Sequence, residues 1–412
     1  MSSAILVVGG GFSGLTAALE AAELGYEVYI IEKEPFLGGR VSQLNKYFPK
    51  LCPPSCGLEI QFQRIKKNPK VKFFTQAELI ELKGEKGNYL AKIKIAPRYT
   101  SAHSANLKEL SESLNGEKIS EFEFKLTNRK ALYLNTPFAF PNRYVLDKSA
   151  ITKSDQIKLA SCSDINLNDT EKEIELNIGS IVFATGWKPY DATRLSNLGA
   201  GQLTNCISNM QLERLASPCG PTLGKIQRPS DSEAPRNVAF VQCAGSRDQN
   251  HLNYCSYICC MASLKQALYI REQYPKAEIT IYYIDLRAPG RYDNMLKRIK
   301  ADPKITLIKG KVAGIKEDCA NKDIIIEVED AIKAEKWEKR HDLVVLATGM
   351  QPSLAGQKLP FNIDLDEDGF ILDAESKGIF AAGCASKPLD VMRSAQSGTS
   401  AAMKAIQVVR GR

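Results

Sequence analysis

The sequence predicts an α/β protein in which two dinucleotide-binding, Rossmann-like domains are nested, with a polar insertion in the first. Two observations lead to this prediction. A glycine-rich turn joins an apolar strand to a helix near the start of the chain, and two later apolar strands, at residues 181–186 and 343–349, end in Ala-Thr-Gly. The 412 residues, 44% hydrophobic and 25% charged, have the composition of a globular protein with roughly two or three domains.

The chain begins with a predicted strand–helix–strand unit. Residues 4–8 form an apolar run typical of a buried parallel strand, and residues 27–31 form the next strand. Between them, a Gly-x-Gly-x-x-Gly pattern opens a helix that ends at Gly25. This pattern between a strand and a helix, followed by an acidic residue at the end of the next strand, predicts a dinucleotide site.

Each residue of the pattern has a physical role. Gly9 permits the tight turn, and Gly11 lets the backbone approach a pyrophosphate at the helix N-terminus. Gly14 allows the helix to pack closely on the strand, and Glu32 can accept hydrogen bonds from a ribose.

The segment after Glu32 narrows the dinucleotide to FAD, because residues 32–40 resemble the segment after the ribose-binding acid in flavoproteins with two dinucleotide domains. In that family, strands ending in Ala-Thr-Gly mark crossings between domains, and residues 378–383 resemble the late strand along the ribityl chain. After the glycine at 383 the family usually has Asp, whereas this chain has Cys384. A helix that begins near Met392 is expected to aim its first backbone amides at the flavin edge. The predicted FAD-binding residues are Gly9, Gly11, Phe12, Ser13, Gly14, Glu32, Lys33, Gly39, Arg40, Ala184, Thr185, Gly186, Gly383, Cys384 and Ala395.

These signals predict the domain boundaries. The FAD-binding domain takes residues 1–230 and 350–412, with an insertion at about 98–180 whose polar stretch is typical of surface segments that contact partners. Residues 235–349 form the second Rossmann-like domain, of the NAD(P) type. Its expected elements are a strand at 237–241, a helix at 259–270 and a strand at 278–284.

The second domain lacks the glycine fingerprint that cradles a phosphate and carries a cysteine group instead. Residues 242–248 replace the fingerprint, which disfavours NAD(P)H binding there. Cys243 is followed after eleven residues by Cys255, and after three more by the tandem pair Cys259 and Cys260. Thiolates suit iron–sulfur clusters, and four complete a [4Fe-4S] cluster; a tetrahedral zinc site is the alternative.

Together, residues 9–40, 243–247, 254–262 and 378–384 resemble the A subunit of heterodisulfide reductase and its relatives. The resemblance implies a thioredoxin-reductase-type fold with FAD and a cluster, held by these cysteines, near the flavin. Residues 43–60 look most like the A subunit of the quinone-interacting membrane-bound oxidoreductase (Qmo) complex. That resemblance implies electron transfer between membrane quinone and adenylylsulfate reductase in dissimilatory sulfur metabolism. The implied partners are a homologous flavin and iron–sulfur subunit, a membrane quinone-reactive subunit and adenylylsulfate reductase itself.

Cys52 and Cys56 leave two interpretations open. They form either a redox disulfide pair or two thiols that line the flavin pocket. The first is compatible with a rival function, a stand-alone NAD(P)H-dependent disulfide reductase. Two further hypotheses are a component of a sulfur-oxidising complex and an assembly scaffold with a structural flavin.

Charge and hydropathy restrict the remaining function classes. The net charge of +8 comes from basic residues that lack the interleaved aromatics of a base-stacking surface, so we expect no nucleic-acid partner. No run approaches the ~18 apolar residues of a spanning helix, and the N-terminus resembles no signal peptide. We therefore expect a cytoplasmic subunit that reaches the inner membrane only through its partners.

Overall fold

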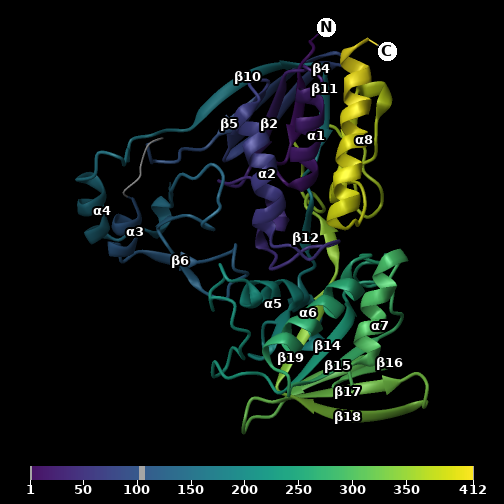
Figure 1. Cartoon of the computed structure of the whole chain (residues 1–412). Coiled ribbons are helices and arrows are strands. Elements are labelled where there is room, and N and C mark those ends of the chain that lie inside the picture. Colours follow the sequence, from purple (N-terminus) through teal and green to yellow (C-terminus); the bar gives the residue numbers. More distant parts are fainter. Residues whose placement is uncertain (1, 102–106, 412) are drawn as a thin grey trace. The chain divides into compact units, whose positions relative to one another are not determined.

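The computed structural model describes residues 2–101 and 107–411, and the chain divides into two compact units (Figure 1). The first unit contains residues 1–187 and 352–412, and the second contains residues 188–351. The chain enters and leaves the second unit through two short paired strands, β12 (Trp187–Pro189) and β20 (Met350–Pro352). One α/β unit is thus inserted into another, which confirms the predicted fold class.

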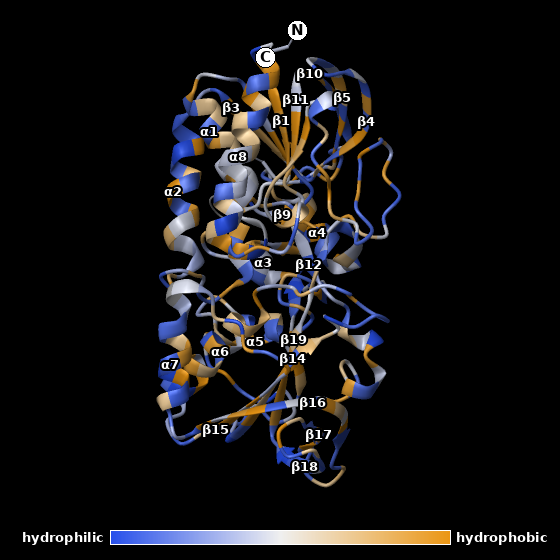
Figure 2. Ribbon diagram, turned by 90° about the vertical axis from the view of Figure 1, so that its right-hand side faces the viewer, coloured by the Kyte–Doolittle hydropathy of each residue, from blue (hydrophilic) through white to orange (hydrophobic). Residues whose placement is uncertain are grey.

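The first unit is built on a five-stranded parallel sheet with the order β21-β11-β1-β2-β3. Its strands are β1 (Ile5–Val8), β2 (Val28–Glu32), β3 (Val71–Thr75), β11 (Ser180–Phe183) and β21 (Ile379–Ala381). The strand β1, and β11 after its buried Ser180, are hydrophobic (Figure 2), as expected for parallel strands covered on both faces.

Three helices pack against this sheet: α1 (Phe12–Glu23), α2 (Pro54–Lys67) and α8 (Val391–Val409). Helices α1 and α8 lie side by side although they come from opposite ends of the sequence (Figure 1). They approach closely at Gly398, where an added Cβ would lie 2.4 Å from the carbonyl oxygen of Ser13.

The rest of the first unit is a small antiparallel sheet and the predicted insertion. The sheet has the order β10-β5-β4, formed by β4 (Ala77–Glu85), β5 (Asn88–Ile95) and β10 (Lys172–Ile178). The insertion contains α3 (Leu107–Ser113), β6 (Glu117–Ile119), β7 (Asn128–Lys130), β8 (Leu132–Tyr133), β9 (Val145–Leu146) and α4 (Lys153–Ala160). Buried leucines such as Leu132 and Leu159 give it a core of its own. Residues 102–106 of the insertion lie outside the described part of the chain.

The second unit is built on a seven-stranded sheet with the order β13-β19-β14-β15-β16-β17-β18. Strands β13 to β16 and β19 pair in parallel, whereas β16, β17 and β18 pair antiparallel. The strands are β13 (Cys206–Ser208), β14 (Asn237–Ala244), β15 (Glu278–Tyr283), β16 (Ile305–Glu317), β17 (Ile324–Asp330), β18 (Glu335–His341) and β19 (Leu343–Thr348). The helices are α5 (Asn209–Ala216), α6 (Cys259–Gln273) and α7 (Asp293–Ala301).

The elements expected from the sequence are present, and two boundaries differ from the predicted ones. The second unit begins at residue 188 and not near 235, because β13 pairs with β19 and so brings residues 188–230 into the second unit. The insertion is shorter than 98–180, because β10 pairs with β5 along its whole length.

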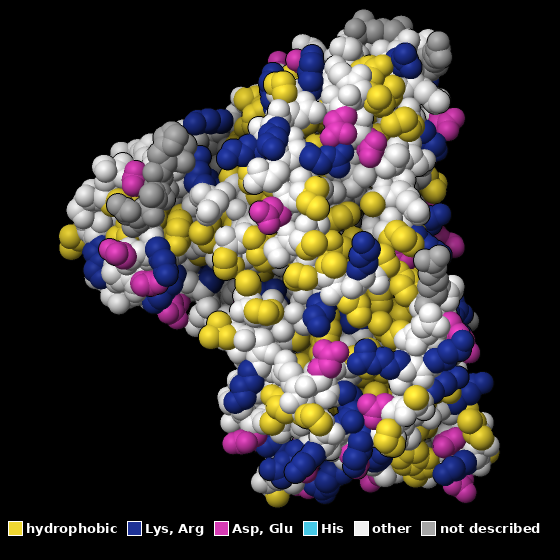
Figure 3. Space-filling view, viewed as in Figure 1, with side chains coloured by type: hydrophobic (Ala, Val, Ile, Leu, Met, Phe, Trp, Pro, Cys, Tyr) yellow, Lys and Arg dark blue, Asp and Glu magenta, His cyan; other side chains and the backbone are white. Residues whose placement is uncertain are grey.

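Many basic side chains pair with neighbouring carboxylates. On the face shown in Figure 3, Lys and Arg are interspersed with Asp and Glu. On α2, Arg64 pairs with Glu23 at 2.8 Å, and on α7, Lys297 pairs with Asp293 at 2.9 Å. None of the helices in the described part of the chain is long and apolar enough to cross a membrane.

Candidate functional site

The loop between β1 and α1 is tightly packed at two of its three patterned glycines. Gly9 has a φ of +113°, and an added Cβ would lie 2.3 Å from the carbonyl oxygen of Ala184. At Gly14 an added Cβ would lie 2.0 Å from the carbonyl oxygen of Gly9. Backbone packing therefore requires glycine at both positions.

Gly11 differs, because the protein itself leaves space beside it. Its φ of −78° and ψ of −179° suit any residue, and the nearest neighbour of an added Cβ is the Cα of Gly39, at 3.8 Å. Gly11 is the N-cap of α1, where unpaired backbone N–H groups and the helix dipole favour an anion. The open space at Gly11 therefore fits a pyrophosphate, and this loop can hold a dinucleotide.

Glu32, the predicted ribose ligand, also organises the loop. One carboxylate oxygen accepts a hydrogen bond from the Gly10 N–H at 2.7 Å, and the other accepts one from the Glu34 N–H at 2.9 Å. Burial raises the pKa of Glu32 above its usual range. A carboxylate has about four acceptor sites, so Glu32 retains capacity for a ribose hydroxyl.

The predicted residues that follow the loop differ in their surroundings. Gly39 packs against the loop, since its added Cβ would lie 2.8 Å from the Cα of Gly11. The Phe12 ring lies 6.0 Å from that of Tyr47. Arg40 donates to the carbonyl of Trp187 at 3.0 Å, and burial lowers its pKa. Lys33 is exposed.

Of the predicted C-terminal residues, Gly383 and Cys384 follow β21, and Ala395 lies on α8. Gly383 faces Ser13, whose Oγ would be 2.5 Å from an added Cβ. The Cys384 thiol donates to the carbonyl of Leu389 at 3.3 Å, and burial raises its pKa to about 11. The Asp390 side chain caps α8 by accepting from the Arg393 N–H at 2.7 Å. Ala395 is half-buried in the first turns of α8, and Thr185 and Gly186 are half-buried beyond β11.

Cys52 and Cys56 flank the start of α2, and both are free thiols. Cys56 is exposed in the first turn, and Cys52 precedes the helix and is half-buried. Burial raises the pKa of Tyr47, and the neighbouring Cys56 and Cys52 thiols raise it further. Both thiols thus lie near one phenol.

In the second unit, the four cysteines of the predicted cluster line one cavity. Its volume is about 290 Å³, including the open mouth. Cys243 lies near the end of β14, Cys255 lies in the following loop, and Cys259 and Cys260 begin α6. The remaining lining residues are Ser246, Arg247, Ser256, Tyr257, Asp285 and Arg287.

The backbone around this cavity adopts an unusual conformation. Cys243, Arg247 and Tyr257 have φ angles of +57°, +58° and +64°, a region that residues other than glycine seldom occupy. Such strain persists where surrounding structure enforces it, and it clusters at functional sites. The neighbouring Ser246 and Ser256 pack closely on Gly349, where an added Cβ would lie 2.3 Å from Ser246 Oγ and 2.9 Å from Ser256 Oγ.

The cysteine thiols influence one another. Burial raises the pKa of Cys243 to about 11, and it also raises the pKa of Cys259 and Cys260. For Cys259, the nearby Cys243, Cys260 and Cys255 thiols add to the effect of burial. Protonated thiols of this kind lose their protons when a cationic centre binds.

The thiols are not arranged around a single ion. Among the residues that the structure describes, no three His, Cys, Asp or Glu side chains are placed to hold one metal ion. A tetrahedral zinc site places all its sulfurs about 2.3 Å from one ion. In a [4Fe-4S] cluster each thiolate binds a different iron atom, so four cysteines lining one cavity are a donor set that fits such a cluster.

Several residues of both sites were not found from the sequence. Gly10 and Glu34 bind the Glu32 carboxylate, and Ser256 and Arg247 lie beside the cysteines. The Ala-Thr-Gly signal marked Gly349, but only as a crossing between domains. Gly10, Glu34, Arg247 and Ser256 lie within the segments that carry the resemblance, but the sequence did not assign them these contacts.

Comparison with known proteins identifies the class. Residues 4–60, which include the glycine loop and Glu32, match the family model described as FAD dependent oxidoreductase. The thioredoxin reductase of T. acidophilum has a TM-score of 0.54 at 15% identity, covering 98% of this chain and 99% of that one. The Lactococcus lactis thioredoxin reductase gives 0.53 at 15% identity, covering both chains completely. The structural comparisons show that the chain has a thioredoxin-reductase-type fold, and its residues 4–60 are similar to FAD-dependent oxidoreductases.

Sequence relatives narrow the family further. The chain is 38% identical to an iron–sulfur A subunit of the CoB–CoM heterodisulfide reductase of Methanopyrus kandleri, over 97% of this chain and 63% of that protein. It is 35% identical to the A subunit of the H(2):CoB-CoM heterodisulfide,ferredoxin reductase of Methanothermobacter thermautotrophicus, over 98% of this chain and 64% of that protein. The chain thus spans less than two thirds of the length of these relatives. Over the shared segment its sequence is similar to A subunits of heterodisulfide reductase, as the resemblance predicted.

Proposed function

We propose that this chain is an electron-transfer subunit that holds FAD in its first unit and a [4Fe-4S] cluster in its second. The observation that carries the proposal is the cavity lined by Cys243, Cys255, Cys259 and Cys260, at the end of β14 where a nicotinamide-binding lobe would have its glycine loop. A flavin takes up electrons in pairs and an iron–sulfur cluster carries them singly, so the two together convert one form of transfer into the other.

The residues of the chain would bind and orient these groups. The open backbone at Gly11 would receive the pyrophosphate at the N-terminus of α1, and Glu32 would bind the ribose. The four thiols would lose their protons on binding the cluster iron. The Methanopyrus relative is named as an iron–sulfur subunit, which supports the same cofactor type here.

Iron analysis of cysteine variants tests the proposal. Cys259→Ser replaces a soft thiolate with a hydroxyl that binds iron poorly, so we expect anaerobically purified protein to lose iron and its brown absorbance but to keep FAD. Cys319→Ser is the matched control, because Cys319 is exposed and does not line the cavity. Wild-type protein with FAD but without iron and labile sulfide would refute the proposal, and zinc in their place would favour a zinc site.

The proposed partners and pathway rest on finer resemblance. Residues 43–60 support a role beside adenylylsulfate reductase, a homologous flavin subunit, and a quinone-reactive membrane subunit, which would place the chain peripherally at the membrane. Relatives named as subunits of larger reductases support a multi-subunit complex in general. Purification of the native chain with its bound partners tests this assignment. A complex without a quinone-reactive subunit would contradict it and would favour a role in a sulfur-oxidising complex.

The rival function is a disulfide reductase driven by NAD(P)H, in which the two free thiols at the start of α2, Cys52 and Cys56, would form the redox pair. In the second unit, however, the space for a phosphate-binding turn is filled, because an added Cβ at Gly245 would lie 2.5 Å from the Tyr190 ring. We expect the isolated chain not to oxidise NADH steadily. Rapid bleaching of the flavin by NADH, abolished in Cys52→Ser, would establish the rival instead.

A further inference from the structure

The four cysteine sulfurs that line the cavity have different polar neighbours. Cys255 Sγ accepts a hydrogen bond from the Tyr257 N–H at 3.4 Å, and the Cys259 and Cys260 thiols donate to the carbonyl oxygens of Thr348 and Asp285 at 3.7 and 3.3 Å. Cys243 differs, because the Arg247 side chain lines the same cavity and its positive charge acts on the Cys243 sulfur.

The position of Arg247 is fixed by several contacts. Its Nη1 lies 2.8 Å from Asp285 Oδ2, and its backbone N–H donates to the carbonyl of Tyr254 at 3.1 Å. The side chain is 28% exposed, so the charge is partly withdrawn from solvent. Asp285 contributes to the same wall of the cavity, since its carbonyl accepts from the Cys260 thiol at 3.3 Å.

We infer that Arg247 acts through Cys243 to raise the reduction potential of the cluster in this cavity, an inference that rests on the function proposed above. Reduction adds a negative charge to a cluster and its sulfurs. A cation beside a ligand sulfur stabilises the reduced form more than the oxidised form, and cluster potentials follow net charge, hydrogen bonds to sulfur and exposure. Arg247 supplies such a charge beside Cys243.

Arg287 provides a matched comparison for Arg247. Both line the cavity and both neighbour Asp285, but Arg247 lies 2.8 Å from its Oδ2 and Arg287 lies 3.9 Å from it. The Arg247 side chain is 28% exposed and that of Arg287 is 52% exposed. Arg247→Gln and Arg287→Gln therefore each remove one positive charge from the same cavity, and the first removes the charge that is less screened by solvent.

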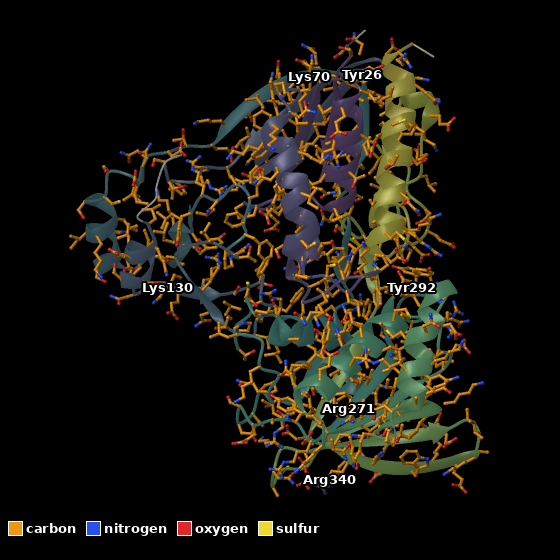
Figure 4. The ribbon with its side chains drawn as sticks, in the orientation of Figure 1. Tyr26, Lys70, Lys130, Arg271, Tyr292 and Arg340 are labelled. Carbon is orange, nitrogen blue, oxygen red and sulfur yellow. The ribbon has the colours of Figure 1, made fainter. Side chains whose placement is uncertain are left out.

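The test is a redox titration of the cluster by electron paramagnetic resonance, with iron content measured in each variant. We expect Arg247→Gln to disfavour reduction about tenfold, or about 59 mV for one electron. Arg287→Gln should shift the potential by less than half as much. Arg271, labelled in Figure 4, is a distant control, because it lies in the last turn of α6, about 18 Å along the axis from Cys259. Arg271→Gln should leave the potential unchanged.

Arg247→Lys keeps the charge without the two-pronged geometry, so its shift should have the same sign and be smaller than that of Arg247→Gln. It also serves as the measured variant if Arg247→Gln does not retain iron. An unshifted potential in the iron-loaded variant, or equal shifts for Arg247→Gln and Arg287→Gln, would overturn the inference alone. Wild-type protein without iron would overturn the proposed function and this inference with it.

Discussion

Gly11 is the position where a substitution should separate cofactor binding from folding. In Gly11→Ala the added methyl has the Cα of Gly39, at 3.8 Å, as its nearest neighbour. The backbone conformation at Gly11 suits alanine. We therefore expect the free energy of unfolding of the flavin-free protein to change by no more than about 1 kcal/mol.

The same methyl occupies the space proposed for the pyrophosphate. Displacing the phosphates from the N-terminus of α1 removes at least one hydrogen bond to a charged group, which contributes about 1.5–3 kcal/mol. The dissociation constant for FAD should then rise roughly 10- to 150-fold. Gly11→Val, with two further carbons in that space, should bind FAD more weakly still.

The assay is a titration of deflavinated protein with FAD, followed by flavin fluorescence and by thermal unfolding with and without FAD. Gly14→Ala is the contrasting variant, because its methyl would lie 2.0 Å from the carbonyl oxygen of Gly9 and should destabilise the protein even without flavin. A dissociation constant for Gly11→Ala within twofold of wild type would refute the placement of the pyrophosphate.

Two further predictions concern stability. Lys265 and Glu213 form an ion pair at 3.0 Å with side chains 4% and 2% exposed, so Lys265→Met should lower the free energy of unfolding by about 3–5 kcal/mol in urea titrations. Lys297→Met, at an exposed ion pair, should change the free energy of unfolding by less than about 1 kcal/mol. Equal effects of the two substitutions would contradict this reasoning. Burial lowers the pKa of His341 to about 3, so between about pH 6.5 and 3 the unfolded chain binds a proton that the folded chain does not. Stability should fall as the pH drops through this window, and a slope unchanged in His341→Gln would rule out His341 as the cause.

The parts of the fold that the sequence predicts are those with local signals. Strand β1 is a short apolar run before a glycine turn, and β19 is an apolar run before Ala-Thr-Gly. The cysteines of the cavity were found because four thiols in a few turns of chain have a specific chemistry. In each case the residues that define the feature are neighbours in sequence.

The features that the sequence did not reveal depend on pairing over long distances. The strand β13 is only three residues long, and its place in the second sheet is determined by β19, which lies more than a hundred residues later. Similarly, Arg247 and Asp285 form a pair across the cavity because β14 and β15 are parallel neighbours. Neither relation leaves a periodic pattern in the sequence.

Both units place their candidate chemistry at the same structural position, the connection from the carboxyl end of a central parallel strand to the next helix. In the first unit β1 leads through glycines to α1, whose free N–H groups favour a phosphate. In the second, β14 leads to α6, whose first two residues are Cys259 and Cys260, and a helix N-terminus favours a thiolate for the same reason. Burial nevertheless raises the pKa of Cys259 and Cys260, so the dipole alone does not ionise these thiols. A cationic centre bound by all four would provide the missing charge, which is why we favour a cluster over a set of buried thiols.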